Sequence, residues 1–199
     1  MAGMWPRAVD RRRAALTGAL AAGVLGAAPA PAATPVAPVV VRDPPDAAVG
    51  GLDITRVQLG RAADGRLRGA LTLAAEWRVR DLPALSGPPG SLCLRLWTRS
   101  EPPATPADYL VCLTADEAGR HLRGSVLAQQ GTELRRVAGA TLARSSARTV
   151  VIRFTQSAIG RPATVRFAGE ATKPGCATPA CVDTAPNAPA TATLTLRTS

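Results

Sequence analysis

The sequence predicts an all-β protein, an antiparallel β-sandwich of about eight or nine strands. Short runs of alternating apolar and polar residues follow one another from Gly51 onward, which is the period of a strand with one buried face. Gly and Pro separate these runs at short intervals, as in sheets joined by turns. Helical periodicity is absent after residue 33, apart from one turn near residues 156–160. Together these three observations favour a sandwich.

Residues 1–33 are predicted to be a signal peptide, so the chain is expected to be secreted and extracellular. Four arginines precede an apolar run over residues 14–28, which has the length of a signal-peptide core and is too short to span a bilayer. Ala30-Pro31-Ala32 supplies a cleavage site, with the mature chain beginning at or near Ala33. The Arg12-Arg13 pair leaves twin-arginine export open beside the general secretory route. No membrane span is expected in the mature chain.

Residues 34–50 are rich in Pro, Ala and Val, and they are predicted to form an extended leader before a sandwich domain over residues 51–199. The first two strands of the domain are expected over residues 52–59 and 67–79, joined by a hairpin at Asp64-Gly65. The remaining strands are expected over residues 92–98, 108–115, 121–128, 133–137, 149–154, 164–169 and 191–197.

Four cysteines are expected to form two disulfides in an exported chain. If the strands over residues 92–98 and 108–115 pair with Cys93 opposite Cys112, their leucines fall on the other face and are buried together. The second pair, Cys176 and Cys181, then closes a Pro-rich loop. Four cysteines permit three connectivities, and this register favours the one described. Zinc binding is the rival, which a chain with one histidine disfavours.

The charge of the chain is basic but spread out. Of its 24 basic and 14 acidic residues, four arginines and one aspartate lie within residues 1–33, so the mature chain carries a net charge of +7. A basic surface attracts nucleic acid and anionic polymers. The arginines of the mature chain form no consecutive block, however, and aromatic residues are scarce. The sequence therefore predicts no nucleic-acid binding.

The sequence offers little support for catalysis. His121 is the only histidine, no G-x-S-x-G motif occurs, and His121 is expected on the outward face of its strand beside a turn. No glycine-rich loop opens a helix, so nucleotide binding has no support. A pair of carboxylates stays open as a catalytic arrangement, because glutamates far apart in sequence can meet in space, namely Glu76, Glu101, Glu133 and Glu170.

Two acidic stretches stand near the two ends of the domain. Asp43-Pro44-Pro45-Asp46 comes shortly before Leu52-Asp53-Ile54-Thr55, and Asp183-Thr184-Ala185-Pro186-Asn187 lies near the C-terminus. The first pair of stretches resembles the opening of secreted bacterial β-sandwiches related to DOMON domains and family 9 carbohydrate-binding modules. The closing stretch resembles the end of the same domains. Pro45 departs from the usual pattern, which has a loop glycine before the second Asp.

The resemblance implies a ligand or calcium near that edge, held by Asp43, Asp46, Asp53 and Asp183. Calcium takes six to eight oxygen ligands, mostly carboxylates and carbonyls. Chain ends often lie close together in compact domains, so one ion could join both stretches. The alternative is that these are solvated loop aspartates that act as turn and cap residues.

Trp97 is the one aromatic residue predicted on an outward face, beside Arg95, and both are candidate ligand-binding residues. An indole that packs against a disulfide is the structural alternative. The sequence as a whole favours a non-catalytic extracellular or cell-wall-associated binding module, with a cell-wall polymer or an extracellular protein as its partner. The second hypothesis is a small secreted hydrolase that uses a carboxylate pair.

Overall fold

The computed structural model describes residues 34–46, 52–99 and 106–196, and these residues form the expected all-β, antiparallel structure. Eleven strands occur within them, more than the eight or nine expected. Two strands that the sequence did not predict, β1 (Val36–Arg42) and β10 (Val182–Ala185), account for the difference. The predicted signal peptide lies outside the described residues.

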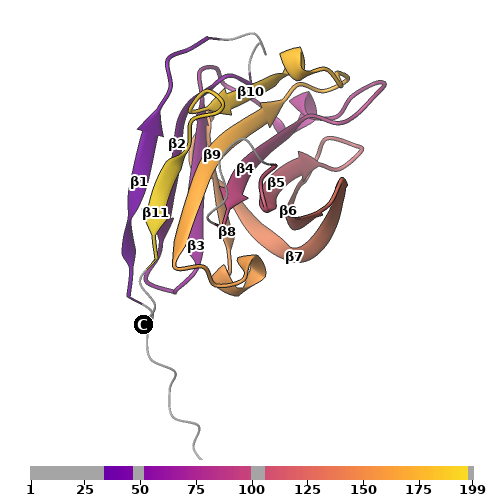
Figure 1. The fold of residues 1–199 in the computed structure, drawn as a ribbon. Coiled ribbons are helices and arrows are strands. Elements are labelled where there is room, and N and C mark those ends of the chain that lie inside the picture. Colours follow the sequence, from indigo (N-terminus) through magenta and orange to yellow (C-terminus); the bar gives the residue numbers. More distant parts are fainter. Residues whose placement is uncertain (1–33, 47–51, 100–105, 197–199) are drawn as a thin grey trace, which may run out of the picture. The chain divides into compact units, whose positions relative to one another are not determined.

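The strands are hydrogen-bonded in one continuous order that folds into two layers (Figure 1). The first layer contains, in order, β1, β2 (Ile54–Arg61), β3 (Leu67–Leu73), β8 (Thr149–Phe154) and the last third of β7 (Glu133–Arg144). The second layer contains the rest of β7, then β6 (Leu122–Gln130), β5 (Tyr109–Ala115), β4 (Ser91–Trp97) and β9 (Thr164–Thr172). Both β10 and β11 (Ala192–Thr195) pair with the free edge of β9.

Strand β7 belongs to both layers. Its residues Glu133 to Ala140 pair with β6, and Thr141 to Arg144 pair with β8. The described helical turns are short 3-10 segments, η2 (Val79–Asp81), η3 (Gln156–Ile159) and η4 (Pro179–Cys181). Within the described ranges, no helix has the length and hydropathy needed to cross a lipid bilayer.

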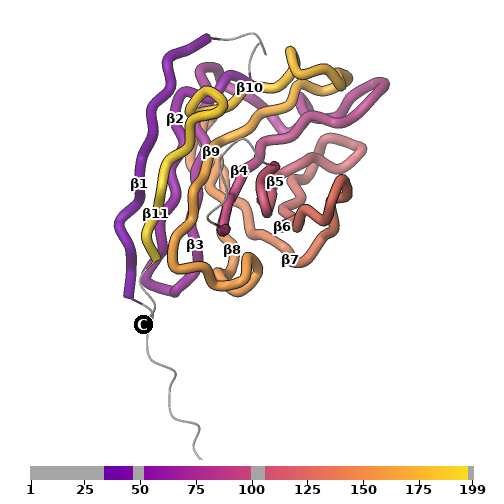
Figure 2. Tube along the Cα trace, in the orientation of Figure 1, coloured from indigo at the N-terminus to yellow at the C-terminus, as the bar shows by residue number. Residues whose placement is uncertain are grey.

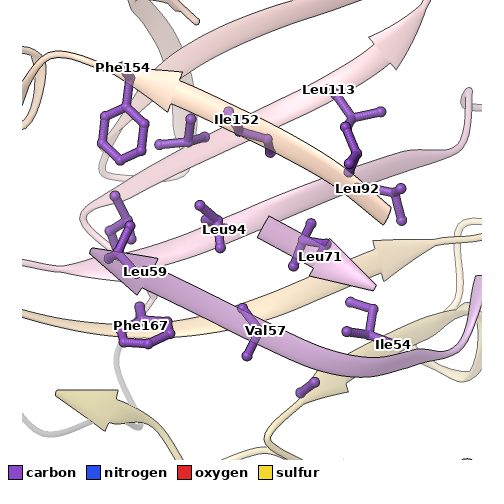
Figure 3. Close-up of a cluster of buried hydrophobic side chains, with 14 of the residues drawn as sticks. Ile54, Val57, Leu59, Leu71, Leu92, Leu94, Leu113, Ile152, Phe154 and Phe167 are labelled. Carbon is purple, nitrogen blue, oxygen red and sulfur yellow. The ribbon is translucent and has the colours of Figure 1, made fainter. Parts of the chain in front are cut away.

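Side chains from the inner faces of both layers fill the core (Figure 3). Val57, Leu59 and Leu71 come from the first layer, whereas Leu94 and Phe167 come from the second, and all are fully buried. These are the residues at alternate positions along each strand, as period-two burial requires. Burying each such side chain stabilises the fold by roughly 1.5–3 kcal/mol.

The predicted β4–β5 register is confirmed. Cys93 lies directly opposite Cys112 and forms a disulfide with it, while Leu94 pairs with Val111 in the same ladder. The second expected disulfide also forms, between Cys176 and Cys181. Its loop links β9 to β10.

The strand predicted over residues 67–79 ends at Leu73. Trp77 continues the apolar pattern beyond it and is only 2% exposed, but it lies in a loop. Arg144 holds the tryptophan there: its guanidinium is 4.6 Å from the ring centre, and its Nη2 donates to the carbonyl oxygens of Trp77 at 2.5 Å and Ala147 at 2.9 Å. Burial beneath the arginine, rather than strand pairing, explains the pattern.

The predicted leader also needs correction, because part of it is a strand of the sheet (Figure 2). β1 pairs with β2, with Val39 opposite Leu59 and Val41 opposite Val57. Both β1 valines pack against the core. Pro38 is accommodated because β1 pairs with β2 alone, and an edge strand has N–H groups that need no partner in the sheet. The folded domain therefore includes β1 and does not begin at residue 51.

Candidate metal site

Three of the four predicted metal ligands come together. Asp43, Asp46 and Asp183 each offer a carboxylate oxygen, and these oxygens all lie within 4.8 Å of one another. Asp43 and Asp46 follow β1 in the first layer, whereas Asp183 lies in β10 of the second. The site thus joins residues about 140 positions apart, which the pairing of β1 with β2 and of β10 with β9 brings to the same edge.

Backbone hydrogen bonds fix the two buried members of this cluster. The N–H of Asp43 donates to the carbonyl oxygen of Thr55 at 3.0 Å. The N–H of Ile54, the first residue of β2, donates to Asp183 Oδ2 at 2.6 Å, so this contact crosses from one layer to the other. The first bond fixes the backbone of Asp43 against β2, and the second holds the Asp183 carboxylate directly through a backbone donor of β2.

Asp46 is the exposed member of the cluster. Its Oδ2 accepts a hydrogen bond of 2.8 Å from Asn187 Nδ2. Asn187 belongs to the closing stretch that the sequence singled out, but it was not predicted as a site residue. Pro45 does not prevent Asp46 from reaching the other two carboxylates.

Asp53, the fourth predicted ligand, lies directly before β2 and is 1% exposed. Its oxygens are not among those that lie within 4.8 Å of one another. Its negative charge nevertheless raises the pKa of both Asp43 and Asp183. Asp53 is thus a close, buried neighbour of the three-carboxylate cluster.

The cluster concentrates negative charge away from water. Asp43 is 9% exposed and Asp183 is 6% exposed. Burial raises the pKa of Asp43, and the charge of Asp46 raises it further, against an opposing hydrogen bond from the Asn187 backbone. Burial likewise raises the pKa of Asp183, and the Ile54 hydrogen bond only partly offsets it. In the described part of the chain, no arginine or lysine is among the groups that shift either carboxyl.

One oxygen of the cluster lacks a partner. Asp43 Oδ2 is buried and has no hydrogen-bond partner among the residues that the structure describes. A buried carboxylate oxygen in that state is costly unless a proton or a cation neutralises it. The donor set contains only oxygen, which is what hard divalent cations such as calcium and magnesium prefer.

Trp97 does not fit the predicted ligand-binding role. It lies on the outer face of β4 as the register requires, but it is only 4% exposed because Ala107, Leu110 and Ala168 pack against it. Arg95 covers it further, with the guanidinium 5.2 Å from the ring centre. The tryptophan is therefore part of a small outer cluster and offers no platform to a ligand.

Arg95, the second predicted ligand-binding residue, lines a pocket of about 560 Å³ beside the Cys176–Cys181 loop. Its Nη1 lies 3.5 Å from Glu170 Oε2, and burial raises the pKa of Glu170 while Arg95 lowers it. Thr172 and Thr184 line the same pocket.

The candidate catalytic residues that the structure describes are not members of the three-carboxylate cluster. His121 is exposed next to a turn, as expected. Glu76 lies in the loop after β3, Glu133 begins β7, and Glu170 is the partner of Arg95 in β9. Glu101 lies outside the described residues.

These features define the class of the domain: a disulfide-linked antiparallel β-sandwich with a three-carboxylate cluster where its two layers meet. No family model, no curated protein and no solved structure matches the chain.

Proposed function

We propose that this protein is an exported, non-catalytic binding module of the extracellular space or cell wall, and that its sandwich holds calcium between its layers. Asp43, Asp46 and Asp183 ligate the ion, and Asp53 adds negative charge beside it. The observation that supports the calcium site is the buried Asp43 Oδ2, which has no hydrogen-bond partner within the described ranges and belongs to a cluster of three converging carboxylates.

The disulfides support the exported state. Cys93–Cys112 and Cys176–Cys181 pair all four cysteines of the chain. Disulfides form and persist in oxidising compartments and are rare in the cytosol of most organisms. The pocket beside the second disulfide, which Arg95 lines, supports a binding role at the surface.

Calcium is expected to stabilise the folded domain, because it binds a cluster that exists only when β1 and β10 are in place. At a free calcium concentration one hundred times the dissociation constant, mass action adds about 2.7 kcal/mol to the free energy of unfolding. Thermal unfolding in millimolar calcium and in chelator measures this gain, and isothermal titration calorimetry gives the stoichiometry. Identical wild-type curves in the two buffers would remove the metal site from the proposal.

Asp46→Asn is the most informative variant. Asp46 is exposed, so its substitution is expected to leave the stability in chelator within about 0.5 kcal/mol of the wild type. The same variant replaces a charged carboxylate ligand by a neutral amide oxygen, so it should lose most of the calcium-dependent gain. Glu117→Gln is the matched control, since Glu117 is exposed in the turn between β5 and β6. A loss of the calcium effect in Glu117→Gln as large as in Asp46→Asn would indicate diffuse counter-ion screening in place of a site.

The binding role is tested separately by incubating the mature protein with isolated cell-wall fractions. Retention on a wall polymer supports the module, and its dependence on calcium shows whether the ion acts on the ligand as well as on stability. Hydrolysis of that polymer, detected as new reducing ends or released fragments, would instead favour the hydrolase hypothesis.

A further inference from the structure

The outer face of the first layer carries four arginines, which we call the arginine face: Arg42, Arg56, Arg68 and Arg153. They come from four adjacent strands, namely β1, β2, β3 and β8. Arg42 lies directly opposite Arg56, and Arg68 lies directly opposite Arg153. Like charges directly opposite each other destabilise a sheet. Two such pairs on one surface therefore need an explanation.

Among the described residues, no carboxylate pairs with these arginines to relieve the repulsion. The other outward positions in the same ladders are glycine, apolar, hydroxyl or amide residues, namely Val40, Gln58, Gly60, Ala70, Thr72, Thr141, Ala143, Thr149 and Val151. Within the described ranges, none of the four arginines forms an ion pair. Arg56 Nη2 instead donates to Gln58 Oε1 at 3.2 Å. The guanidinium groups are thus left to interact with solvent or with a partner.

The acidic residue next to Arg42 in the sequence faces away from the arginine face. Arg42 faces outward, while the next residue, Asp43, is buried in the three-carboxylate cluster. The separation leaves a strongly basic surface on the outer face of the first layer. Positive and negative groups are therefore sorted to different places, which is the charge distribution expected of a surface that attracts an anionic partner.

The geometry of the face suits an extended partner. Adjacent strands lie about 4.8 Å apart, and the Arg42–Arg56 pair is four residues along the strands from the Arg68–Arg153 pair, or about 13 Å. Guanidinium groups bind carboxylates through two parallel hydrogen bonds. Two arginine pairs spaced in this way match a linear polymer that carries repeated carboxylates.

We infer that the arginine face docks an anionic polysaccharide whose repeating units carry carboxylates. The outward residues named above include no aromatic side chain, and proteins that bind single-stranded nucleic acid use aromatic side chains to stack the bases. The inference rests on the proposed role as an extracellular binding module and names its partner. It does not depend on the calcium site.

The test uses the mature protein and immobilised polygalacturonate, a polymer of uronic acids, with neutral dextran as the reference. The wild type is expected to bind polygalacturonate at 50 mM NaCl and to bind it at least tenfold more weakly at 200 mM NaCl. It is expected to show no binding to dextran. Arg56→Gln/Arg68→Gln/Arg153→Gln should weaken binding at least tenfold. Because this substitution removes like-charge repulsion, the variant should melt at or above the wild-type temperature.

The matched control is Arg123→Gln/Arg135→Gln/Arg136→Gln. These three arginines are exposed on β6 and β7, and their loss changes the net charge by the same amount. The control should bind like the wild type. Equal weakening in both triple variants would attribute binding to total charge and overturn the inference, as would failure of the wild type to bind at 50 mM NaCl.

Two further measurements separate the proposals. Tighter wild-type binding to a single-stranded oligonucleotide or to anionic lipid vesicles than to polygalacturonate would overturn the choice of partner. Asp46→Asn should bind polygalacturonate in chelator as the wild type does. This result would support binding by the arginine face that does not depend on calcium. A loss of binding in Asp46→Asn equal to that in the arginine triple variant would overturn that independence and move the docking site to the acidic cluster.

Discussion

Removal of the Cys93–Cys112 disulfide by Cys93→Ala/Cys112→Ala is expected to lower the free energy of unfolding by about 3 kcal/mol. The bond joins residues 19 positions apart, and closing a loop of that length in the unfolded chain removes conformational entropy worth about 3 kcal/mol. Cys176 and Cys181 are only 5 positions apart, for which the same relation gives about 2 kcal/mol. The disulfide in the sheet should therefore matter more than the one in the loop.

The native sheet should survive this change. Beyond its pairing with Cys112, Cys93 lies opposite Glu170 of β9, and Cys112 lies opposite Ser125 of β6, so both strands are held on both sides. The effect is therefore expected mainly in the unfolded chain. Alanine is used because both cysteines are buried, and a buried serine hydroxyl without a partner would add its own penalty.

Urea unfolding of the wild type and of both double variants, followed by tryptophan fluorescence and circular dichroism, measures the two losses. Trp77 and Trp97 are buried, so the fluorescence reports on the folded domain. The sheet variant should also show a larger dependence of stability on urea, because its unfolded chain is less compact. An equal or larger loss for Cys176→Ala/Cys181→Ala would refute the loop-entropy reasoning, and so would a loss below about 1 kcal/mol for the sheet variant.

Further predictions concern a buried carboxylate and a glycine. Burial raises the pKa of Asp108, but hydrogen bonds from Arg99 and Thr98 outweigh burial and lower it below 3.8. Asp108→Asn should therefore cost about 2 kcal/mol at pH 7, and this difference should shrink as the pH falls below 3.8; an equal difference at pH 7 and pH 3 would contradict the reasoning. Gly124→Ala should cost about 1–3 kcal/mol, because its Cβ would overlap the backbone carbonyl of Ala140 on β7. Gly139→Ala, whose Cβ would meet only Arg136 Nη2 at 3.8 Å, is the control, and equal melting of the two variants would argue against the overlap.

The sequence was most informative where two local signals agreed. In the strands over Leu92 and Leu113, period-two burial and the cysteine positions specified the same register, and the structure has that register. Beyond Leu73 the alternation of apolar residues was the only signal, and the strand that it predicted is wrong there. The alternation continues to Trp77 because Trp77 is buried under Arg144, and not because these residues pair in a sheet. Burial of a loop residue leaves the same pattern as burial of a strand residue.

Surfaces and sites were harder to predict because they depend on contacts between distant segments. The burial of Trp97 arises from Ala107 on a loop and Ala168 on β9, neither of which lies beside it in sequence. The aspartates were identifiable by type, but only the placement of β1 and β10 shows that Asp183 meets Asp43. The arginine face was not predicted because its four arginines are scattered along the chain. They lie together only because β1, β2, β3 and β8 are adjacent in one layer.

The two layers are joined in different ways at opposite sides of the sandwich. At one side β7 runs through both layers, so the junction consists of backbone hydrogen bonds and can open only if the ladder breaks. At the other side, in the described part of the chain, no strand runs through both layers, and the Ile54–Asp183 hydrogen bond and the neighbouring carboxylates cross the junction beside packed side chains. Transient opening of the domain is therefore expected to start between β1 and β10, where no backbone ladder of the described residues joins the two layers.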